Sequence, residues 1–491
     1  MNVVLPLVVA LLSGVGLIIL GKAPRFRRWA ALTGMAVYFA SGIALLRDIV
    51  VGGPQWVSMG GWKPPLGIEF HADVFSAMLV AMAGLVGLMT TCYGLGSSDS
   101  RRDEIGHHPV TFFLMAGVTG AFLTGDLFNL YVWFELILLA SFILISLGDE
   151  KRHLRAAIHY VILNLVGSAL FLAGLGLLYG ATGTLNMGQL GQVLYSEVNL
   201  PTAVTIGTLI TIAFCVKAAV FPFSAWLPAS YPSAPTAVAA LFAGLLTKVG
   251  VYCLYRTSTH TFDSLPDFHF ETLAFLAIVT SVIGALAATV QNDIRRIFAF
   301  LLVSHVGLMV LGLSVSIRDG IAYTWQHMPV ICALYLMLGL ITRGGGSAKL
   351  SELGGFGRAY PWLGTLFIVA GFSLSGVPPL SGFWPKLGMM QGAVTSAEYY
   401  ALATIVFVGI LTLIAVARVW RAVFWRPSPV EGKPSDIERP IRMLSMVAPI
   451  VILVGLSVAI GLFPSPFYRL ATRADEELKT TTMTFDVVEA R

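Results

Sequence analysis

Fourteen separate stretches of this sequence are long and apolar enough to cross a membrane as α-helices. A spanning helix needs about 20 predominantly apolar residues to match a hydrocarbon core about 30 Å thick. The stretches are 3–20, 29–46, 73–95, 109–125, 127–147, 156–179, 203–222, 236–255, 271–290, 297–316, 321–341, 362–394, 400–420 and 443–463. They predict an all-α, polytopic membrane protein with about 14 transmembrane helices.

The composition argues against the main soluble classes of protein. Of the 491 residues, 56% are hydrophobic and only 12% are charged, whereas a soluble domain carries about 25% charged residues. So little charge cannot cover a soluble surface, which excludes a soluble enzyme, a disordered interaction hub and a DNA-binding protein. The first apolar stretch lacks the charged leading segment of a signal peptide, so we expect it to remain as a span.

Lysine and arginine residues are divided unevenly between alternate loops. With the N-terminus placed outside, the inside loops hold 20 of the 31 basic residues, the outside segments hold 8, and three lie within spans. The inside set is Lys22, Arg25, Arg27, Arg28, Arg101, Arg102, Lys151, Arg152, Arg155, Arg295, Arg296, Arg343, Lys349, Arg358, Arg418, Arg421, Arg426, Lys433, Arg439 and Arg442. Because basic loops favour the cytoplasmic side, we expect both termini on the outer side.

Four ionisable residues lie inside predicted spans, namely Glu135, Lys217, Lys248 and Lys386. Each costs at least about 2.5–3.5 kcal/mol to place in a membrane, and such residues usually mark ion pathways. Buried lysines release protons more readily than exposed ones, so the four form a candidate proton-transfer row. The alternative is a structural ion pair, with the remaining lysines extending their amines to the membrane surface.

Two histidines are further candidates for proton transfer. His327 lies in YTWQHMPVICALY and His305 in LLVSHVGLMVLG, both within predicted spans. A neutral imidazole accepts a hydrogen bond on one nitrogen and donates on the other, so it can relay a proton. The alternative is that each histidine is a packing residue on an apolar helix.

Three aspartates lie at the edges of predicted spans. They are Asp73, Asp126 and Asp293. An aspartate at the start of a helix accepts hydrogen bonds from the first backbone N–H groups. We therefore expect exposed capping roles for these three residues.

The sequence contains no motif for a cofactor or a metal. The four cysteines, Cys92, Cys215, Cys253 and Cys332, each lie in an apolar run, and none forms a C-x-x-C pair. That pattern favours packing over disulfides or iron–sulfur ligation. A dinucleotide-binding fingerprint and a P-loop are also absent from the sequence. We therefore predict no cofactor and no metal site.

Two of the predicted spans are interrupted. The seventh runs into FPFSAWLPASYPSAP and the twelfth contains SLSGVPPLSGFWPK. Broken helices at membrane depth persist where they line a cavity or a polar path. Spans 4–8 and spans 9–13 would be two five-helix units, each with the break in its fourth helix, which predicts inverted repeats. Ordinary proline kinks are the alternative.

This pattern predicts four regions along the chain. A three-helix N-terminal segment covers 1–108 and the first inverted repeat covers 109–255. The second inverted repeat covers 271–420, and a final helix with a polar C-terminal tail covers 421–491.

Several stretches carry a resemblance to a known superfamily. They are DVFSAML (73–79), DLFNLYVWFELILLASF (126–142), FCVKAAVFPFSAWLPASYPSAPTAVAALFAGLLTKVGVY (214–252), QNDIRRIFAFLLVSHVGLMVLG (291–312) and SGVPPLSGFWPK (375–386). From about Phe70 to Trp420, the chain resembles the antiporter-like subunits shared by respiratory complex I and the Mrp-type multisubunit cation/proton antiporters. It is most similar to the D-type subunits of the Mrp antiporters, because position 386 is lysine where one complex I relative has glutamate.

The resemblance implies a role for each candidate residue. Glu135 would pair with Lys217 and modulate the proton affinity of that lysine. Lys248 and His327 would form a central relay. Lys386 would give protons to one side of the membrane or take them from it.

The resemblance also implies a function and partners. It implies a proton-translocating subunit of a Na+/H+ antiporter, not an enzyme, in the inner membrane of a prokaryotic cell. The implied partners are subunits of the A, B, C, E, F and G types, membrane lipid, H+ and Na+, with no nucleic acid. Because Glu135 is the only clear mid-span acid, we expect a partner subunit to carry the cation.

Three points stay open. The chain could instead be a proton-pumping subunit of complex I or of a membrane-bound hydrogenase, or an assembly subunit that conducts nothing. The family often has a lysine about five residues after the histidine at position 327, but here that position is Cys332. Central transfer would then depend more on His327 and water.

Overall fold

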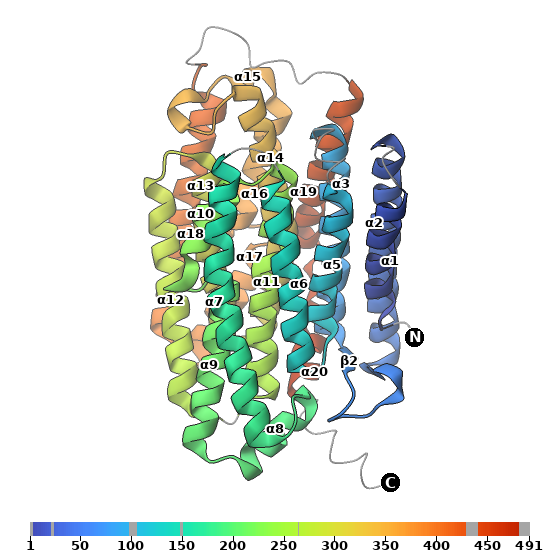
Figure 1. Ribbon diagram of the computed structural model, residues 1–491. Helices are drawn as coiled ribbons and strands as arrows, with labels where there is room; N and C mark the ends of the chain where they lie inside the picture. The colour runs from blue at the N-terminus through green and yellow to red at the C-terminus, as the bar shows by residue number, and fades with distance from the viewer. Residues whose placement is uncertain are drawn as a thin grey trace.

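The computed structural model describes residues 3–20, 24–97, 106–147, 151–263, 265–428 and 440–480. Within these residues the chain is a bundle of long helices with similar axis directions (Figure 1). The helices that run along the bundle are α1 (Leu5–Ile19), α2 (Pro24–Gly52), α3 (Val74–Ser97), α5 (His107–Leu123), α6 (Leu127–Ser146), α7 (Lys151–Thr182), α9 (Leu200–Ala218), α11 (Thr236–His260), α12 (Asp267–Val290), α13 (Ile294–Val315), α14 (Ile317–Gly345), α16 (Pro361–Ser375), α17 (Phe383–Thr395), α18 (Tyr399–Trp420) and α19 (Pro440–Leu462).

The smaller elements lie mainly near the ends of the bundle. They are α8 (Met187–Glu197), α10 (Trp226–Ser230), α15 (Phe356–Ala359), α20 (Pro464–Thr480) and the strands β1 (Gln55–Ser58) and β2 (Glu69–Ala72). The two strands pair antiparallel, with Gln55 opposite Ala72. The strands, α8 and α20 lie at the lower end in Figure 1, and α15 lies at the upper end.

The helices agree with the predicted spans. Every one of the fourteen stretches coincides with a helix or a pair of helices, which confirms the all-α prediction. Eleven helical segments of the described chain are long and apolar enough to cross a membrane, and α1 and α16 are shorter apolar helices. The total of fourteen crossings stays a prediction.

Both predicted interruptions are present. The helix α9 ends at Ala218 because Ala219 adopts a left-handed conformation with φ of 64°, and α10 begins at Trp226. The helix α16 ends at Ser375 because Gly376 has φ of 89°, and α17 begins at Phe383. Positive φ removes a residue from the right-handed helical region, so it terminates each helix.

The interior and the periphery of the bundle differ in enclosure. The helices α11 and α14 are almost wholly enclosed by other helices, and α3 and α13 are nearly so. The helices α2, α7, α12 and α18 turn much of their surface outward, and the outward side chains include Val51, Phe275 and Val290. Exposed apolar faces of this length suit contact with lipid.

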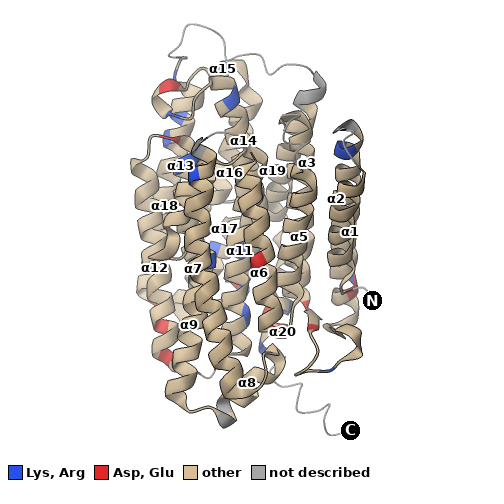
Figure 2. Ribbon diagram, viewed as in Figure 1, with Lys and Arg blue, Asp and Glu red and all other residues tan. Residues whose placement is uncertain are grey.

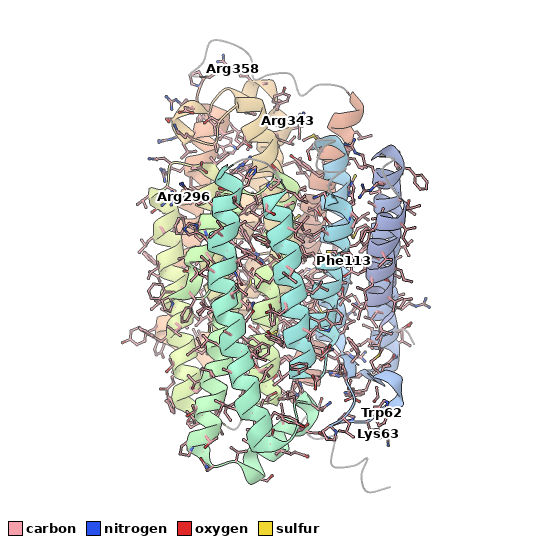
Figure 3. All side chains as sticks on the ribbon, in the orientation of Figure 1. Trp62, Lys63, Phe113, Arg296, Arg343 and Arg358 are labelled. Carbon is pink, nitrogen blue, oxygen red and sulfur yellow. The ribbon has the colours of Figure 1, made fainter. Side chains whose placement is uncertain are left out.

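Basic side chains gather at one end of the bundle. Figure 2 shows lysines and arginines concentrated near α15, and Figure 3 labels Arg296, Arg343 and Arg358 there. Lys63 lies at the opposite end, in the loop between the strands (Figure 3). Of the basic residues counted in the sequence, Lys22, Arg101, Arg102, Lys433, Arg439 and Arg491 lie outside the described residues.

Candidate functional site

Lys217 lies in the last turn of α9, directly before the break. Its side chain is buried. The ammonium group donates to the hydroxyl of Ser168 at 2.8 Å and to the backbone carbonyl of Asn164 at 3.2 Å, both on α7. It also lies 5.3 Å from the ring centroid of Phe134 on α6. Lys217 on α9 thus contacts α6 and α7, and all of these contacts are with neutral groups.

Glu135 follows Phe134 on α6 and is partly buried. Its Oε1 atom is enclosed and has no hydrogen-bond partner. The ion pairs within 4.0 Å in the described chain do not include Glu135 with Lys217. Glu135 is therefore next in sequence to Phe134, which Lys217 contacts. Its carboxylate makes no direct salt bridge with Lys217 in this conformation.

Lys248 lies in the middle of α11 and is fully buried. Its ammonium group donates to the carbonyl of Ala243 at 2.6 Å. Two residues later, Gly250 lies against Ala218, and a Cβ at position 250 would come within 2.5 Å of the Ala218 backbone nitrogen. The glycine therefore allows α11 to approach the end of α9 that carries Lys217.

His305 on α13 and His327 on α14 are brought together in the core. Both are fully buried, and their ring centroids are 5.2 Å apart. His305 Nδ1 makes a hydrogen bond with the hydroxyl of Tyr323, and its Nε2 lies 3.4 Å from the hydroxyl of Thr412. Neither ring nitrogen of His327 has a hydrogen-bond partner. A buried imidazole with two free nitrogens can take up a proton on either one.

Lys386 lies in the first turn of α17, directly after the second break. Its ammonium group donates to the carbonyls of Leu374 and Ser375 at 3.0 and 2.9 Å. These carbonyls are at the end of α16, where a helix leaves backbone acceptors without intrahelical partners. The same ammonium group lies 5.8 Å from the ring centroid of Tyr323. The hydroxyl of Tyr323 in turn bonds His305 of the histidine pair.

The helices that carry these residues pack in sequence across the bundle. The successive packed pairs are α6 with α7, α7 with α9, α9 with α11, α11 with α14 and α14 with α17. The helices that carry Glu135, Lys217, Lys248, His327 and Lys386 are therefore connected by packing, from α6 at one end of the series to α17 at the other. Among the described residues, no group of three histidine, cysteine, aspartate or glutamate side chains is placed to hold a metal ion.

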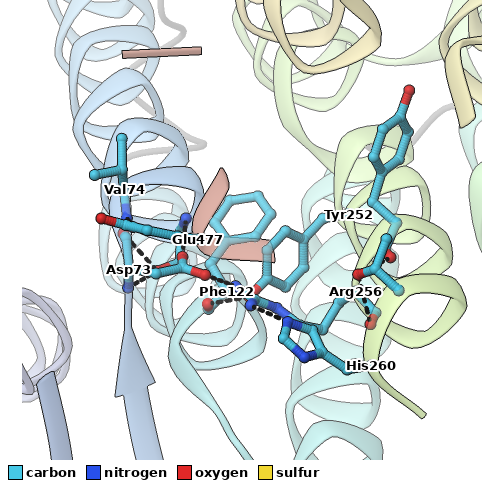
Figure 4. Close-up of polar contacts among 10 residues, drawn as sticks. Asp73, Val74, Phe122, Tyr252, Arg256, His260 and Glu477 are labelled. Carbon is cyan, nitrogen blue, oxygen red and sulfur yellow. Dashed lines mark hydrogen bonds and ion pairs between the residues drawn. The ribbon is translucent and has the colours of Figure 1, made fainter. Parts of the chain in front are cut away.

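A second buried polar cluster was missed in the sequence (Figure 4). Asp73 caps α3 as expected, because its Oδ1 atom accepts from the backbone nitrogen of Ser76 at 2.8 Å, but it is fully buried and not exposed. Arg256, which the count of basic residues assigns to an outside segment, is buried as well. Arg256 lies within α11, and its Nη2 atom forms an ion pair with Asp73 Oδ2 at 2.6 Å, with side-chain exposures of 4% and 0%. The helix α11 continues beyond residue 255 to His260, so it includes the arginine.

The other members of this cluster extend it to the lower end of the bundle. Arg256 also bonds the hydroxyl of Tyr252 at 3.0 Å and Nε2 of His260 at 3.2 Å. Burial, opposed in part by Asp73, lowers the pKa of His71 to about 4. Glu477 on α20 accepts from the backbone nitrogen of Val74 at 2.7 Å. The tyrosine and histidine at intervals of four residues from Arg256 were the available signal in the sequence.

The predicted capping roles of two other aspartates are confirmed. Asp126 accepts from the backbone nitrogen of Asn129 at the start of α6. Asp293 accepts from those of Arg295 and Arg296 at the start of α13. Both carboxylates satisfy helix N-terminal donors, although Asp126 is buried and not exposed.

Comparisons with known proteins give the same family from sequence and from structure. Residues 124–412 match the family model described as "NADH:quinone oxidoreductase/Mrp antiporter, TM". The chain is 35% identical over 492 residues to a protein from Alkalihalophilus pseudofirmus that is named as the D-type subunit of a Na(+)/H(+) antiporter, and the match covers 99% of each chain.

Two solved assemblies contain chains of the same fold. A chain in the Mrp complex from a Dietzia species is similar with a TM-score of 0.90 and 28% identity, covering 99% of both chains. A chain in respiratory complex I from Thermus thermophilus is similar with a TM-score of 0.77 and 26% identity, covering 95% of this chain and 99% of that one.

Proposed function

This chain belongs to the family of NADH:quinone oxidoreductase/Mrp antiporter transmembrane proteins, and from that premise we propose that it translocates protons as one subunit of a multisubunit Na+/H+ antiporter. In this proposal the chain is a transporter subunit and catalyses no chemical reaction. Its partners are the other subunits of an Mrp-type complex. The name of the antiporter relative and the similarity to the chain of the Mrp complex support this assignment.

The observation that carries the proposal is the set of buried lysines without acidic partners. In the described chain, Lys217, Lys248 and Lys386 are buried and form no ion pair within 4.0 Å. An isolated buried charge costs several kcal/mol, so such a lysine readily exchanges its proton with a neighbouring base. His327, between Lys248 and Lys386 in helix order, supplies that base.

The row also suggests how protons are driven. Moving the Glu135 carboxylate towards Lys217 would increase the proton affinity of that lysine, and moving it away would release the proton along the row. The unpaired Oε1 atom of Glu135 and the neutral acceptors around Lys217 fit the separated arrangement. Cation binding in a partner subunit would bias this equilibrium.

The proposed orientation places the chain in the cell membrane with both termini outside. The basic residues near α15 (Figure 2) would then face the cytoplasm, in accord with the positive-inside tendency. The lower end, with the strands, α8 and α20, would face outward. We also propose that residues 109–255 and 271–420 are the two inverted repeats, since each contains one broken helix.

The test is proton flux in inverted membrane vesicles that contain the whole complex. Glu135→Ala and Lys217→Ala should each lower Na+-driven proton flux by at least about tenfold, because each removes one member of the proton path. Lys63→Ala is the matched control, since Lys63 is exposed and should leave the flux unchanged. Normal assembly with unchanged flux in both row variants would contradict the proposal.

A second function is supported by the similarity to a chain of respiratory complex I. In that case the same row would pump protons as part of a redox-driven complex. The set of subunits that co-purifies in mild detergent separates the two functions. Small Mrp-type subunits support the antiporter, whereas quinone-binding or iron–sulfur subunits support the redox pump.

A further inference from the structure

Asp319 is a buried carboxylate that the proposed row does not use. It lies in the first turn of α14, at the lower end of the bundle, and its side chain is 1% exposed. Its Oδ2 atom accepts from the hydroxyl of Ser316 at 2.6 Å and from Arg318 Nη2 at 3.0 Å. Its Oδ1 atom is buried and has no hydrogen-bond partner. One carboxylate oxygen is therefore hydrogen-bonded, and the other is enclosed without a hydrogen-bond partner.

Asp319 is one of the residues that line a cavity of about 290 Å³. The walls include Arg318, Gln391 on α17 and Tyr468 on α20. Arg318 is 42% exposed, so the cavity reaches the surface of the chain. Burial and the nearby Asp319 carboxylate raise the pKa of the Tyr468 hydroxyl well above its usual value. A buried acid therefore lies in the wall of a cavity that reaches the surface.

The backbone of α17 approaches this carboxylate closely. Gly388 lies directly against Asp319 Oδ1, and the space there is too small for a Cβ atom. Gly388 is two residues beyond Lys386 on the same helix. The carboxylate thus contacts the helix that carries the last lysine of the row.

Asp319 lies on the same helix, α14, as His327 of the histidine pair. Asp319, Tyr323 and His327 are spaced by four residues, so they lie on one face of the helix, with about 6 Å of rise between neighbours. The Tyr323 hydroxyl bonds His305, which lies beside His327. The Lys386 ammonium group lies 5.8 Å from the Tyr323 ring. Titratable groups therefore run from the enclosed core to the cavity.

We propose that Asp319 is the proton-exchange residue that connects the row to the lower face of the bundle, an inference that rests on the proposed function. A hydronium ion in the cavity gives its proton to Oδ1, which forms the neutral acid and leaves a water molecule. The O–H bond then breaks as the proton passes inward to the Tyr323, His305 and Lys386 group, which regenerates the carboxylate. The reverse sequence releases a proton outward.

A proton fits this site better than a metal cation does. Arg318 already places a positive charge on Oδ2, which opposes the binding of a second cation nearby. The remaining wall groups of the cavity supply few anionic ligands, because Asp319 is the only carboxylate among its lining residues. The facing groups from the packed helices are Tyr468 on α20 and Gln391 on α17. Tyr255 on α11 lies near both Asp319 and Asp475 of α20.

The experiment measures Na+-driven proton flux in vesicles that contain the whole complex. Asp319→Asn keeps the shape but cannot carry the proton, so the maximal rate should fall at least about tenfold with an unchanged KM for Na+. Asp319→Glu should restore most of that rate, which a purely structural role would not predict. Asp267→Asn is the control, because Asp267 is an exposed acid at the same end.

Two further variants separate the outcomes. Gly388→Ala keeps the carboxylate but places a methyl group against Oδ1, so it should also slow the flux; it tests the idea even if Asp319→Asn fails to assemble. Lys248→Ala reports on the row itself. Loss of flux in Lys248→Ala, with wild-type rates in the Asp319→Asn or Gly388→Ala complex, overturns this inference alone. Retained flux in Lys248→Ala overturns the proposed function as well.

Discussion

At the level of single residues, Lys217, Lys248 and Lys386 all donate hydrogen bonds to backbone carbonyls. Lys217 and Lys386 contact backbone carbonyls of neighbouring helical segments, and Lys248 contacts a carbonyl of its own helix. Carbonyl acceptors stabilise an ammonium group without fixing its charge as a carboxylate would. We therefore propose that each lysine can gain and lose its proton, which a stable salt bridge would oppose.

His71 gives a prediction that concerns stability and pH. The folded state holds its pKa near 4, and the unfolded value is about 6.5. Between these values the unfolded chain binds the extra proton, so stability falls as the pH falls from 7 to 5, by about 2 kcal/mol. His71→Phe keeps a ring against Trp56, on which His71 stacks at 4.6 Å, but it cannot titrate.

The measurement is the thermal midpoint of the purified complex at pH 7 and at pH 5. The variant should lose less stability on acidification than the wild type. His159→Phe is the control, because His159 is exposed. Equal pH sensitivity of His71→Phe and the wild type would show that the histidine contributes nothing to the acid response.

The sequence predicts residues in mid-span better than residues at span ends. Glu135, Lys217, Lys248 and Lys386 are conspicuous because charge is rare in apolar runs. Asp73, Arg256 and Asp319 lie near helix ends, where charge is common. Their burial depends on how far α11 continues and on how α20 packs on α3 and α14, and neither is readable from local composition.

At the level of elements, the breaks in α9 and α16 are the predicted features with the clearest physical basis. Proline and glycine at 222, 376, 378 and 379 indicate the interruptions. The sequence did not indicate where each helix stops. The predicted span 203–222 continues to residue 222, but α9 ends at Ala218 because Ala219 takes positive φ. The inverted-repeat interpretation stays a prediction.

Gly376 gives a prediction for the second break. Its φ is 89°, and a Cβ there would lie 2.7 Å from Cδ of Lys386. Gly376→Ala should destabilise the chain by at least about 1 kcal/mol because of the left-handed backbone, and it should lower proton flux by displacing the lysine. Thermal denaturation and vesicle flux measure the two effects.

The matched control for this change is Gly455→Ala on α19. Gly455 lies in a helix with no atom within 4 Å of the position of an added Cβ. Alanine there should be neutral or slightly stabilising. If Gly376→Ala behaved like Gly455→Ala in both measurements, the left-handed turn would have no role in positioning Lys386.

At the level of the whole molecule, the low charge content has two separate explanations. The peripheral helices turn apolar side chains outward, as lipid contact requires. The few charges that remain are either at the ends of the bundle (Figure 2) or enclosed among α6, α9, α11, α14 and α17. The enclosed set is the one that hydrophobic packing does not explain.

The whole-molecule architecture was predictable because helix length and hydropathy are local properties. The packing order of the helices was not, since it depends on small residues such as Gly250, Gly307 and Gly320, which allow close approach between particular pairs. The order of the helices that carry the proposed row could be given only when that packing order was known.

Proton translocation by this chain is tested most sharply in the Lys248→Ala complex, measured for both proton flux and Na+ binding. Lys248 is the central, fully buried lysine of the row. In this complex, Na+-driven proton uptake should be lost while Na+ binding is retained. Normal proton uptake in the assembled Lys248→Ala complex, or loss of Na+ binding with proton movement intact, would contradict it.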